Sequence, residues 1–299
     1  MATPQQIARI NDVLHQIHKD ITADLNGKQL AQVAAYSEQH LHRVFAEIVG
    51  ESLHQYIRRS RLEVAANQLM FSPETAIVDI AEKCGFQSLS SFSRAFRATF
   101  GCAPGQWRKH LNTEDKPYLK DPEIAAAYCR LQDQHLPTPE LIDLPAYRVA
   151  YIRHQGYGRN IRNSWQLLTA WAASQDISLL TTPDVQIGLH HSNPSRIPLE
   201  QCRYVACTAI EAPLRKAVPL KKRGIINEMI IPGGLHACFK LHGRYGELLP
   251  WISKIMEEWL PESGLVAKTT PAFAIYEKNH FLNKNEEFSL KFCLPVGFY

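Results

Sequence analysis

The sequence predicts two domains of different fold class: an all-α N-terminal domain with two helix-turn-helix motifs, and an α+β C-terminal domain of duplicated βαββ units around a ligand cleft. Three observations support this. Apolar residues recur every three or four positions through residues 1–111, which is the helical period. Residues 144–299 hold short apolar runs typical of strands. Each half also repeats itself, and a length of 299 residues favours two domains over one.

The first helix is predicted from an apolar stripe. Ile7, Ile10, Leu14, Ile17 and Ile21 share one face of an amphipathic helix. The same period predicts helices over residues 30–36, 38–49, 53–70, 77–84 and 89–100. The pattern is interrupted where helices end most easily, at Gly27, Gly50, Ser72-Pro73, Gly85 and Gly101.

The first domain contains an internal repeat with an offset of about 51 residues. The coinciding pairs are Ser37/Ser88, Arg43/Arg94, Phe45/Phe96, Gly50/Gly101, Gln55/Gln106 and Tyr56/Trp107. Upstream the offset is 50, as in Ala31/Ala81 and Tyr36/Phe86, so the second copy has one extra residue at its turn. Each copy reads as a short helix, a tight turn and a second helix that ends at glycine, which is a helix-turn-helix.

The remainder of the chain changes in character. Residues 112–143 are predicted to be a linker, because they are rich in Pro, Asp, Glu and Gln and contain one short helical stretch, 122–131. Beyond it, helices are predicted over 161–174 and 245–259. Strands are predicted over residues 147–152, 185–189, 204–210, 235–241, 272–276 and 288–296.

The second domain also repeats itself, at an offset of 88 residues. The coinciding pairs are His154/His242, Tyr157/Tyr245, Gly158/Gly246 and Trp171/Trp259, and Tyr151 aligns with Phe239. Each copy reads strand, glycine-containing loop, helix, strand, strand. Two such units can pair their sheets around a shared concave surface, and a cleft of that kind suits a small ligand.

Composition narrows the classes of protein. A net charge of +4 does not by itself indicate nucleic-acid binding, and in residues 1–111 the 12 Lys and Arg exceed the 10 Asp and Glu by only two. Seven scattered Cys without a CxxC pair argue against a disulfide framework or structural zinc. No apolar run reaches membrane-spanning length, and residues 1–6 lack the charged start of a signal peptide. We expect a soluble, cytoplasmic protein with no metal or cofactor.

The first domain resembles the DNA-binding domain of the AraC-type transcription regulators of bacteria, over about residues 6–111. The resemblance rests on Tyr-Ser-x3-Leu-x-Arg-x-Phe-x4-Gly at 36–50 and on Cys-Gly-Phe-x5-Phe-Ser-Arg-x-Phe-x3-Phe-Gly-x2-Pro-x2-Trp-Arg at 84–108. Ala35 departs from the family, which often has Gly there, and a left-handed turn would be strained at Ala. The resemblance implies double-stranded DNA as a partner, and RNA polymerase is considered as a further one.

Base-reading positions follow from this resemblance. They are the exposed residues at the start of each second helix: Gln39, His42 and Arg43 in the first motif, and Ser90, Ser91, Ser93 and Arg94 in the second. Arg can bind guanine, and Gln adenine, through two hydrogen bonds. We expect Arg97, Arg108 and Lys109 to contact phosphates. The alternatives are surface ion pairs for Arg43 and Arg94, and solvent or phosphate contact for the serines.

The second domain resembles the gyrase-inhibitor-like (GyrI-like) effector-binding domain, over about residues 144–299. This implies a small-molecule effector, lipophilic or cationic, held by Glu277 beneath walls formed by Tyr151, Trp171, Phe239 and Phe273. Glu277 at the end of its strand could instead be solvated, and the aromatic residues could be core. Cys293 stands where the family often has an aromatic residue. The alternatives are a hydrolase that uses the Glu as a general base, or a protein-interaction module.

Overall fold

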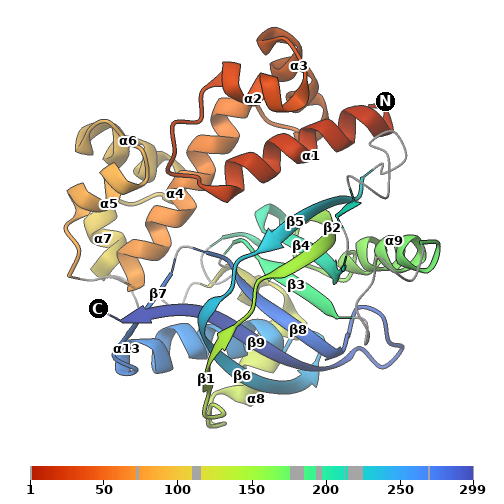
Figure 1. Cartoon of the computed structure of the whole chain (residues 1–299). Coiled ribbons are helices and arrows are strands. Elements are labelled where there is room, and N and C mark those ends of the chain that lie inside the picture. The colour runs from red at the N-terminus through yellow and green to blue at the C-terminus, as the bar shows by residue number, and fades with distance from the viewer. Residues whose placement is uncertain are drawn as a thin grey trace. The chain divides into compact units, whose positions relative to one another are not determined.

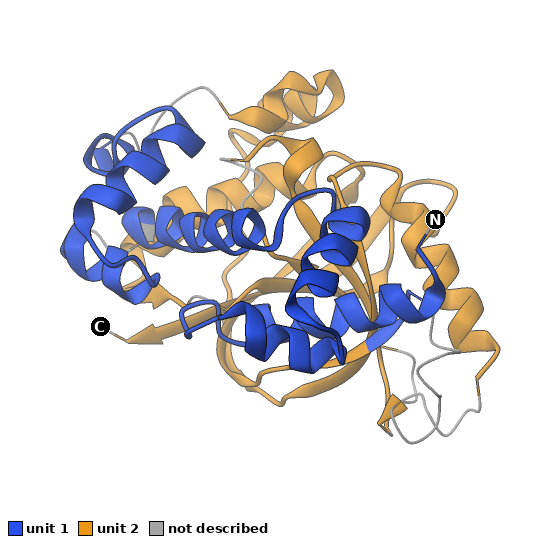
Figure 2. Cartoon of the chain, turned by 90° about the horizontal axis from the view of Figure 1, so that it is seen from above, with its two compact units in different colours: residues 1–111, 215–227 blue, residues 112–214, 228–299 orange. Residues whose placement is uncertain are grey.

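The computed structural model divides the chain into two compact units, residues 1–111 with 215–227 and residues 112–214 with 228–299 (Figure 2). The residues that it describes are 2–71, 74–109, 116–175, 185–192, 197–211, 213–214, 225–268 and 270–298. No helix within these ranges is long and apolar enough to cross a membrane.

The first unit is helical, as the sequence predicts (Figure 1). Its helices are α1 (Pro4–Lys19), α2 (Gly27–Ala34), α3 (Glu38–Val49), α4 (Leu53–Phe71), α5 (Ile77–Lys83), α6 (Leu89–Phe100) and α7 (Pro104–Lys109). The sequence reading misses only the short α7. Pairs α2–α3 and α5–α6 are the two helix-turn-helix motifs, and α4 connects them.

The turns of the two helix-turn-helix motifs have the same left-handed backbone, at Ala35 in the first and at Gly85 in the second. Ala35 after α2 and Gly85 after α5 both have a left-handed backbone, with φ of 51° and 75°. Ala35 therefore has the left-handed backbone that is strained for Ala. The caps of the following helices are Ser37 and Ser88, so the extra residue of the second motif is Gln87. Gly85 has a further reason to be Gly, because a Cβ there would lie 2.7 Å from Cζ of Arg61.

Each helix-turn-helix has its own apolar core. Leu41 and Phe45 of α3 pack with Tyr56 of α4 in the first, and Phe92 and Phe96 of α6 pack with Leu69 of α4 in the second. Because α4 contributes to both cores, it holds the motifs in one body. Arg61 of α4 reinforces the link, since its guanidinium donates to the carbonyls of Ile21, Ala23 and Gly85 at 3.0, 2.8 and 3.2 Å.

The second unit is an antiparallel sheet with helices, as predicted. Its strands are β1 (Glu140–Leu144), β2 (Tyr147–Gln155), β3 (Gln186–His190), β4 (Arg203–Ala209), β5 (Asn227–Ile231), β6 (Gly234–Arg244), β7 (Leu265–Ala267), β8 (Ala272–Lys278) and β9 (Glu287–Phe298). The order is β1-β6-β9-β8-β3-β4-β2-β5, with β7 paired to β9. The short strands β1, β5 and β7 are additions that the sequence reading misses.

The duplication is visible in the strand order. One βαββ unit is β2, α9 (Ile161–Ala173), β3 and β4, and the other is β6, α12 (Leu248–Lys254) with the π-helix η4 (Ile255–Trp259), β8 and β9. The order β6-β9-β8 followed by β3-β4-β2 is a palindrome, so the copies join at the β3–β8 pair. The short helix α13 (Leu260–Glu262) follows η4.

The two faces of this sheet differ, and we name them by what covers them. On the helix face, Trp165 of α9 packs on Tyr276 and Trp259 of η4 packs on Phe239. The opposite face, which we call the thiol face, carries an apolar cluster that includes Val149, Tyr151, Ile187, Leu189, Val205, Cys207, Cys238, Phe273 and Cys293. Residues alternate between the faces along each strand.

The segment predicted as a linker is instead part of the second unit. It contains η1 (Pro117–Lys120), α8 (Pro122–Leu131) and β1, which pairs with β6. The ammonium group of Lys116 is buried and lies 2.6 Å from the Glu257 carboxylate. Within the described residues 116–143, burial of an apolar helix face and of a paired charge explains why this Pro-rich, polar stretch packs on the second unit.

Candidate nucleic-acid interface and effector site

Helix α3 presents the three residues expected from the first motif on one side. Gln39 and Arg43 are exposed and His42 is half-buried, whereas Leu41, Val44 and Phe45 are buried. Positions 39, 42 and 43 are spaced by three and four, so their side chains are neighbours on the helix surface. The guanidinium of Arg43 contacts Nδ1 of His40 at 3.3 Å, within the same helix, and among the described residues it forms no ion pair with a carboxylate.

Helix α6 has the same organisation. Ser90, Arg94 and Arg97 are exposed and Ser93 is half-buried, opposite the buried Phe92 and Phe96. Ser91 differs from the other predicted residues, because its hydroxyl donates to the Ser88 carbonyl at 2.8 Å and its amide donates to the Ser88 hydroxyl at 3.2 Å. It is therefore engaged in capping its own helix.

The repeat places the two sets in equivalent positions. Gln39 corresponds to Ser90, His42 to Ser93, Arg43 to Arg94 and Ala46 to Arg97. Both helices begin at a capped N-terminus, with Ser37 and Ser88 accepting a backbone hydrogen bond at 3.3 and 3.2 Å. The first turn of each exposed helix can thus approach a phosphate while its side chains face base edges.

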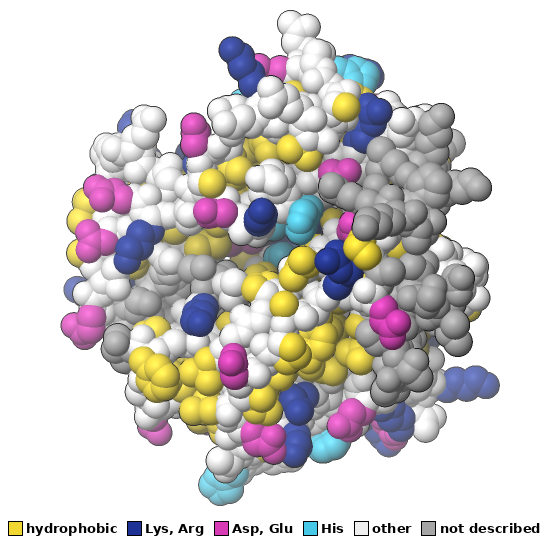
Figure 3. Space-filling view, viewed as in Figure 1, with side chains coloured by type: hydrophobic (Ala, Val, Ile, Leu, Met, Phe, Trp, Pro, Cys, Tyr) yellow, Lys and Arg dark blue, Asp and Glu magenta, His cyan; other side chains and the backbone are white. Residues whose placement is uncertain are grey.

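One expected phosphate contact is already engaged in the protein. The guanidinium of Arg108 donates to the Thr75 carbonyl at 2.6 Å and is half-buried. Arg97, by contrast, is exposed on α6. On the face drawn in Figure 3, Lys and Arg side chains are dispersed among Asp and Glu, so bulk charge does not mark the interface.

The five predicted effector residues do not lie together. Tyr151 and Phe273 are buried in the thiol face, whereas Phe239 is on the helix face beneath Trp259, with ring centroids 5.1 Å apart. Trp171 is half-buried near the end of α9. In the sequence, Tyr151 aligns with Phe239, but in the structure the two side chains point to opposite faces of the sheet.

Glu277 is exposed, which corrects its expected place beneath aromatic walls. The register of β8 against β9 shifts between Tyr276 and Lys278, so Glu277 lies at an irregularity near the end of the strand, where its side chain is open to solvent. The Glu277 carboxylate accepts a hydrogen bond of 2.7 Å from the Ser289 hydroxyl. Its role as a buried counter-charge is therefore not supported.

A different cluster occupies the junction of the two repeats on the helix face. It consists of Tyr157, His190, Tyr204, Tyr276 and His280, and we call it the Tyr/His cluster. Ring centroids are 5.5 Å apart for His190 and Tyr204, and 5.9 Å apart for Tyr276 and His280. The Tyr204 and Tyr276 hydroxyls lie 3.2 Å apart.

Several polar atoms of the Tyr/His cluster are buried without a partner. Among the described residues, these include Oη of Tyr157, Nε2 of His190 and Nδ1 of His280. Burial lowers the pKa of His190 to about 4 and that of His280 to about 3, and it raises the pKa of Tyr157 well above 10. At neutral pH all three side chains are uncharged. Unpaired buried polar atoms are costly, and a bound ligand that supplies hydrogen bonds would remove that cost.

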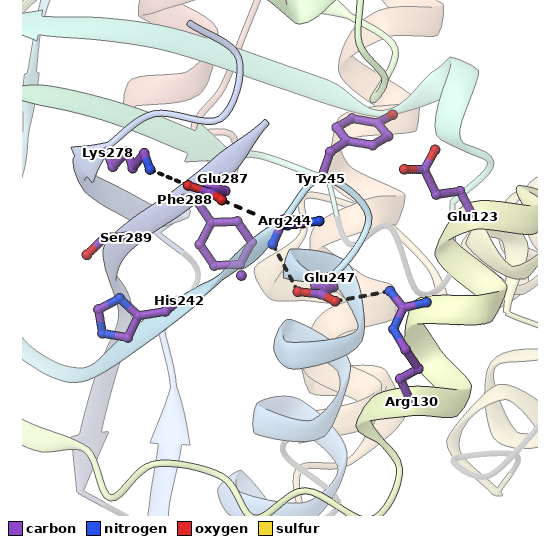
Figure 4. A pocket seen from close by; sticks show the side chains of 11 residues that line it. Glu123, Arg130, His242, Arg244, Tyr245, Glu247, Lys278, Glu287, Phe288 and Ser289 are labelled. Atoms are coloured by element: carbon purple, nitrogen blue, oxygen red, sulfur yellow. Dashed lines mark hydrogen bonds and ion pairs between the residues drawn. The ribbon is translucent and has the colours of Figure 1, made fainter. Parts of the chain in front are cut away.

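Next to this cluster there is an open pocket of about 900 Å³, and Figure 4 shows the side chains that line it. Two ion pairs form between residues that line the pocket: Arg130 binds Glu247 at 3.0 Å, and Lys278 contacts Glu287. Tyr245 and Phe288 line the pocket, and their rings lie 6.2 and 5.5 Å from His280. These two side chains therefore contact both the open pocket and the His280 ring of the Tyr/His cluster.

Arg159 connects the loops beside this pocket. Its guanidinium lies 4.0 Å above the Tyr245 ring and binds Glu286 at 2.7 Å and Glu123 at 2.9 Å. Glu286 has a left-handed backbone with φ of 52°, which is strained for Glu. Arg159 thus holds together α8, the β2–α9 loop and the β8–β9 loop.

The sequence contained part of the signal for this site. The repeat pairs Tyr157 with Tyr245. In the structure, Tyr157 belongs to the Tyr/His cluster and Tyr245 lines the adjacent pocket. Tyr204, Tyr276 and His280 carried no motif. They meet because the strand order brings β4 and β8 to either side of β3.

Comparison with protein families gives two matches. A family described as the GyrI-like small molecule binding domain matches residues 137–297. A family described as a helix-turn-helix domain matches residues 30–110.

Among characterised proteins, the chain is similar to the HTH-type transcriptional activator AarP of Providencia stuartii. The two are 35% identical over 123 residues, which are 41% of this chain and 90% of AarP. The regulatory protein SoxS of Escherichia coli K12 is 36% identical over 102 residues, 34% of this chain and 94% of SoxS. Among solved structures, EcmrR in a complex with DNA is 14% identical, covers 91% of this chain and 99% of its own, and has a TM-score of 0.47.

Proposed function

The chain belongs to the GyrI-like family and carries an AraC-type helix-turn-helix domain, and from this premise we propose how its two units work. It is an AraC-family DNA-binding transcription regulator with a GyrI-like domain. The finer assignments are which side chains bind DNA, where an effector binds and what its chemistry is.

We propose that α3 and α6 each enter the major groove of one DNA duplex. Gln39, His42 and Arg43 then face bases from α3, and Ser90, Ser93 and Arg94 face bases from α6. The observation that carries this is the equivalence of the two exposed faces, with Arg43 and Arg94 at matching positions. Ser91 orders the start of α6, and Arg97 binds a phosphate.

The site on DNA should be asymmetric, because both reading helices come from one chain and differ in their side chains. Two successive major-groove segments require a site of roughly 15–20 base pairs. Selection from random DNA by the purified protein, followed by footprinting of the selected sequences, tests this. A palindromic footprint that needs two chains per site would contradict it.

For the second unit we propose that a small molecule binds at the Tyr/His cluster, entering through the adjacent open pocket. The unpartnered polar atoms of Tyr157, His190 and His280 support this, since the ligand would give them hydrogen bonds. Tyr245 and Phe288 would have to move aside, and both line the open pocket.

The proposed effector is lipophilic and offers uncharged hydrogen-bonding groups. The cluster contains aromatic rings, phenol hydroxyls and uncharged imidazoles, and Glu277 is exposed outside it. A carboxylate of that kind would be needed to offset the cost of burying a cation. The same placement weakens the hydrolase alternative, which required Glu277 as a general base in a pocket.

Calorimetric titration with matched charged and uncharged aromatic ligands tests this assignment. Tyr157→Phe should weaken binding of the uncharged ligand by about tenfold, as expected for the loss of one hydrogen bond to a buried group. Glu277→Gln should bind both ligands as the wild type does. If Glu277→Gln weakened binding of the charged ligand alone, the effector site would instead include the Glu277 carboxylate. Product formation during the titration would indicate an enzyme.

A further inference from the structure

Cys238 and Cys293 form a pair of thiols on the thiol face. They are direct partners across the antiparallel strands β6 and β9, and their sulfur atoms lie 3.5 Å apart and share a hydrogen bond. Both side chains are almost fully buried. A disulfide requires the two sulfurs to approach to about 2.05 Å, so a small side-chain movement of each Cys would suffice.

The surroundings favour thiolate formation at one of the two sulfurs. The hydrogen bond from Cys293 lowers the pKa of Cys238, and the same bond with burial raises the pKa of Cys293. Lys291 lies two residues from Cys293 on β9, so its cation is on the thiol face and lowers the pKa of Cys238, whereas burial and Glu140, which pairs with Lys240 at 2.8 Å, act in the opposite direction. Cys238 is thus the better nucleophile and Cys293 the thiol that remains protonated beside it.

We propose that Cys238 and Cys293 are a reversible oxidation site, at which hydrogen peroxide produces a disulfide across β6 and β9. The Cys238 thiolate attacks one peroxide oxygen, the O–O bond breaks, and the departing hydroxide takes up a proton to become water. The Cys238 sulfenic acid is then attacked by the Cys293 sulfur, which loses its proton. The S–S bond forms as the S–O bond breaks, and a second water leaves. Two thiols are oxidised and one peroxide is reduced.

The third thiol of the same cluster provides a matched comparison. Cys207 is also buried on the thiol face, but its sulfur lies 3.8 Å from the Val205 carbonyl oxygen, on a different pair of strands. Burial raises its pKa well above the ordinary value. Cys207 should therefore resist the same treatment, and the contrast separates a reactive pair from general oxidation of buried thiols.

The test uses the reduced full-length protein. After treatment with hydrogen peroxide, free thiols are blocked and the chain is digested and analysed by mass spectrometry. We expect a peptide in which Cys238 and Cys293 are linked, with a loss of two hydrogens, and its disappearance after treatment with dithiothreitol. In undigested, denatured protein, free thiols should fall from the seven Cys of the chain to five.

Variants test whether Cys238 and Cys293 form a disulfide or only pack in the core. Cys293→Ser should abolish the linked peptide, and Cys207→Ser should form it as the wild type does. Because Cys293→Ser places a hydroxyl in the core, wild-type peptide mapping stands independently of whether that variant folds. The proposal is overturned if Cys238 and Cys293 stay unlinked in wild-type protein while the exposed Cys129 becomes oxidised.

Discussion

The hydroxyl oxygens of Tyr204 and Tyr276 lie 3.2 Å apart, one from each βαββ copy, and they meet directly over Gly188. Tyr204 also accepts a hydrogen bond of 3.1 Å from Nε1 of Trp165. Gly188 lies on β3 between them, and a Cβ there would be 2.8 Å from Cζ of Tyr204 and 3.0 Å from Cε2 of Tyr276. The absence of a side chain at this one position allows the two phenols to meet at the junction of the copies.

Gly188→Ala should therefore destabilise the second unit by about 1–3 kcal/mol, which is the usual cost of overpacking a filled core. Chemical denaturation followed by tryptophan fluorescence measures it, because Trp165 is part of the same contact. Gly105→Ala is the control, since a Cβ there would meet only Ile77 at an ordinary distance of 3.7 Å and would lie within helix α7. Equal stability of the two variants would mean that the phenols can move apart freely.

Tyr204 and Tyr157 of the cluster should respond differently to loss of the hydroxyl. Tyr204→Phe leaves the buried Trp165 N–H without its acceptor and should cost about 1–3 kcal/mol of unfolding free energy. Tyr157→Phe removes a hydroxyl that has no partner in the described part of the chain, so stability should be unchanged or higher. Denaturation curves give both values. A large loss in Tyr157→Phe would show that its hydroxyl is structural, which would contradict the proposed ligand contact.

The pH dependence of stability tests whether His190 and His280 are buried as neutral side chains. Their folded-state pKa values, about 4 and about 3, lie below the ordinary 6.5. Between pH 6.5 and 4 the unfolded chain binds protons that the folded chain does not, so stability falls as the pH falls. Between pH 7 and 5, His190 alone should account for about 2 kcal/mol.

The measurement is urea denaturation at pH 7, 6 and 5, where most carboxylates stay ionised. His190→Phe keeps an aromatic ring and removes the titration, so it should lose less stability than the wild type over this range. An unchanged pH slope in His190→Phe would place the titrating group elsewhere.

Elements that several independent sequence features indicate are predicted correctly, and elements that depend on contacts distant in the sequence are not. Helix α3 was predicted with its observed bounds because the period of three and four, Ser37 and Gly50 all indicate the same segment. The strand β1 was missed because it is an exposed edge strand with little alternation, and it is ordered by pairing with β6. The expected burial of Glu277 is wrong because the residue lies near the end of β8, where the strand is exposed, and alternation predicts the face of a residue but not its depth.

Ala35 offers a test in the first unit. Because a left-handed backbone is strained for Ala and natural for Gly, Ala35→Gly should stabilise the protein by about 0.5–1 kcal/mol. Ala46→Gly is the matched control: Ala46 is exposed in α3, and Gly there should destabilise by about 1 kcal/mol. Thermal unfolding of both variants gives the signs, and destabilisation by Ala35→Gly would mean that the methyl group makes a contact that outweighs the strain.

The two arginines at equivalent positions should specify different base pairs. Arg43→Ala and Arg94→Ala should each weaken binding to the selected site by about 1–3 kcal/mol, and each should relax preference at one position, because an Arg side chain can bind guanine through two hydrogen bonds. The two affected positions should lie about one helical turn apart, because we propose that α3 and α6 enter successive segments of the groove. Arg97→Ala should act differently. Loss of a phosphate contact weakens binding to all sequences alike and lowers the dependence of log K on log salt by about one unit. Because the residue equivalent to Arg97 in the first motif is Ala46, the chain itself shows that the fold accepts Ala at this position.

Binding is measured for the selected site, a set of single-base variants and random DNA at several salt concentrations. If all three variants lose affinity uniformly across sequences, Arg43 and Arg94 bind the backbone, and base reading must come from Gln39, His42 and the serines.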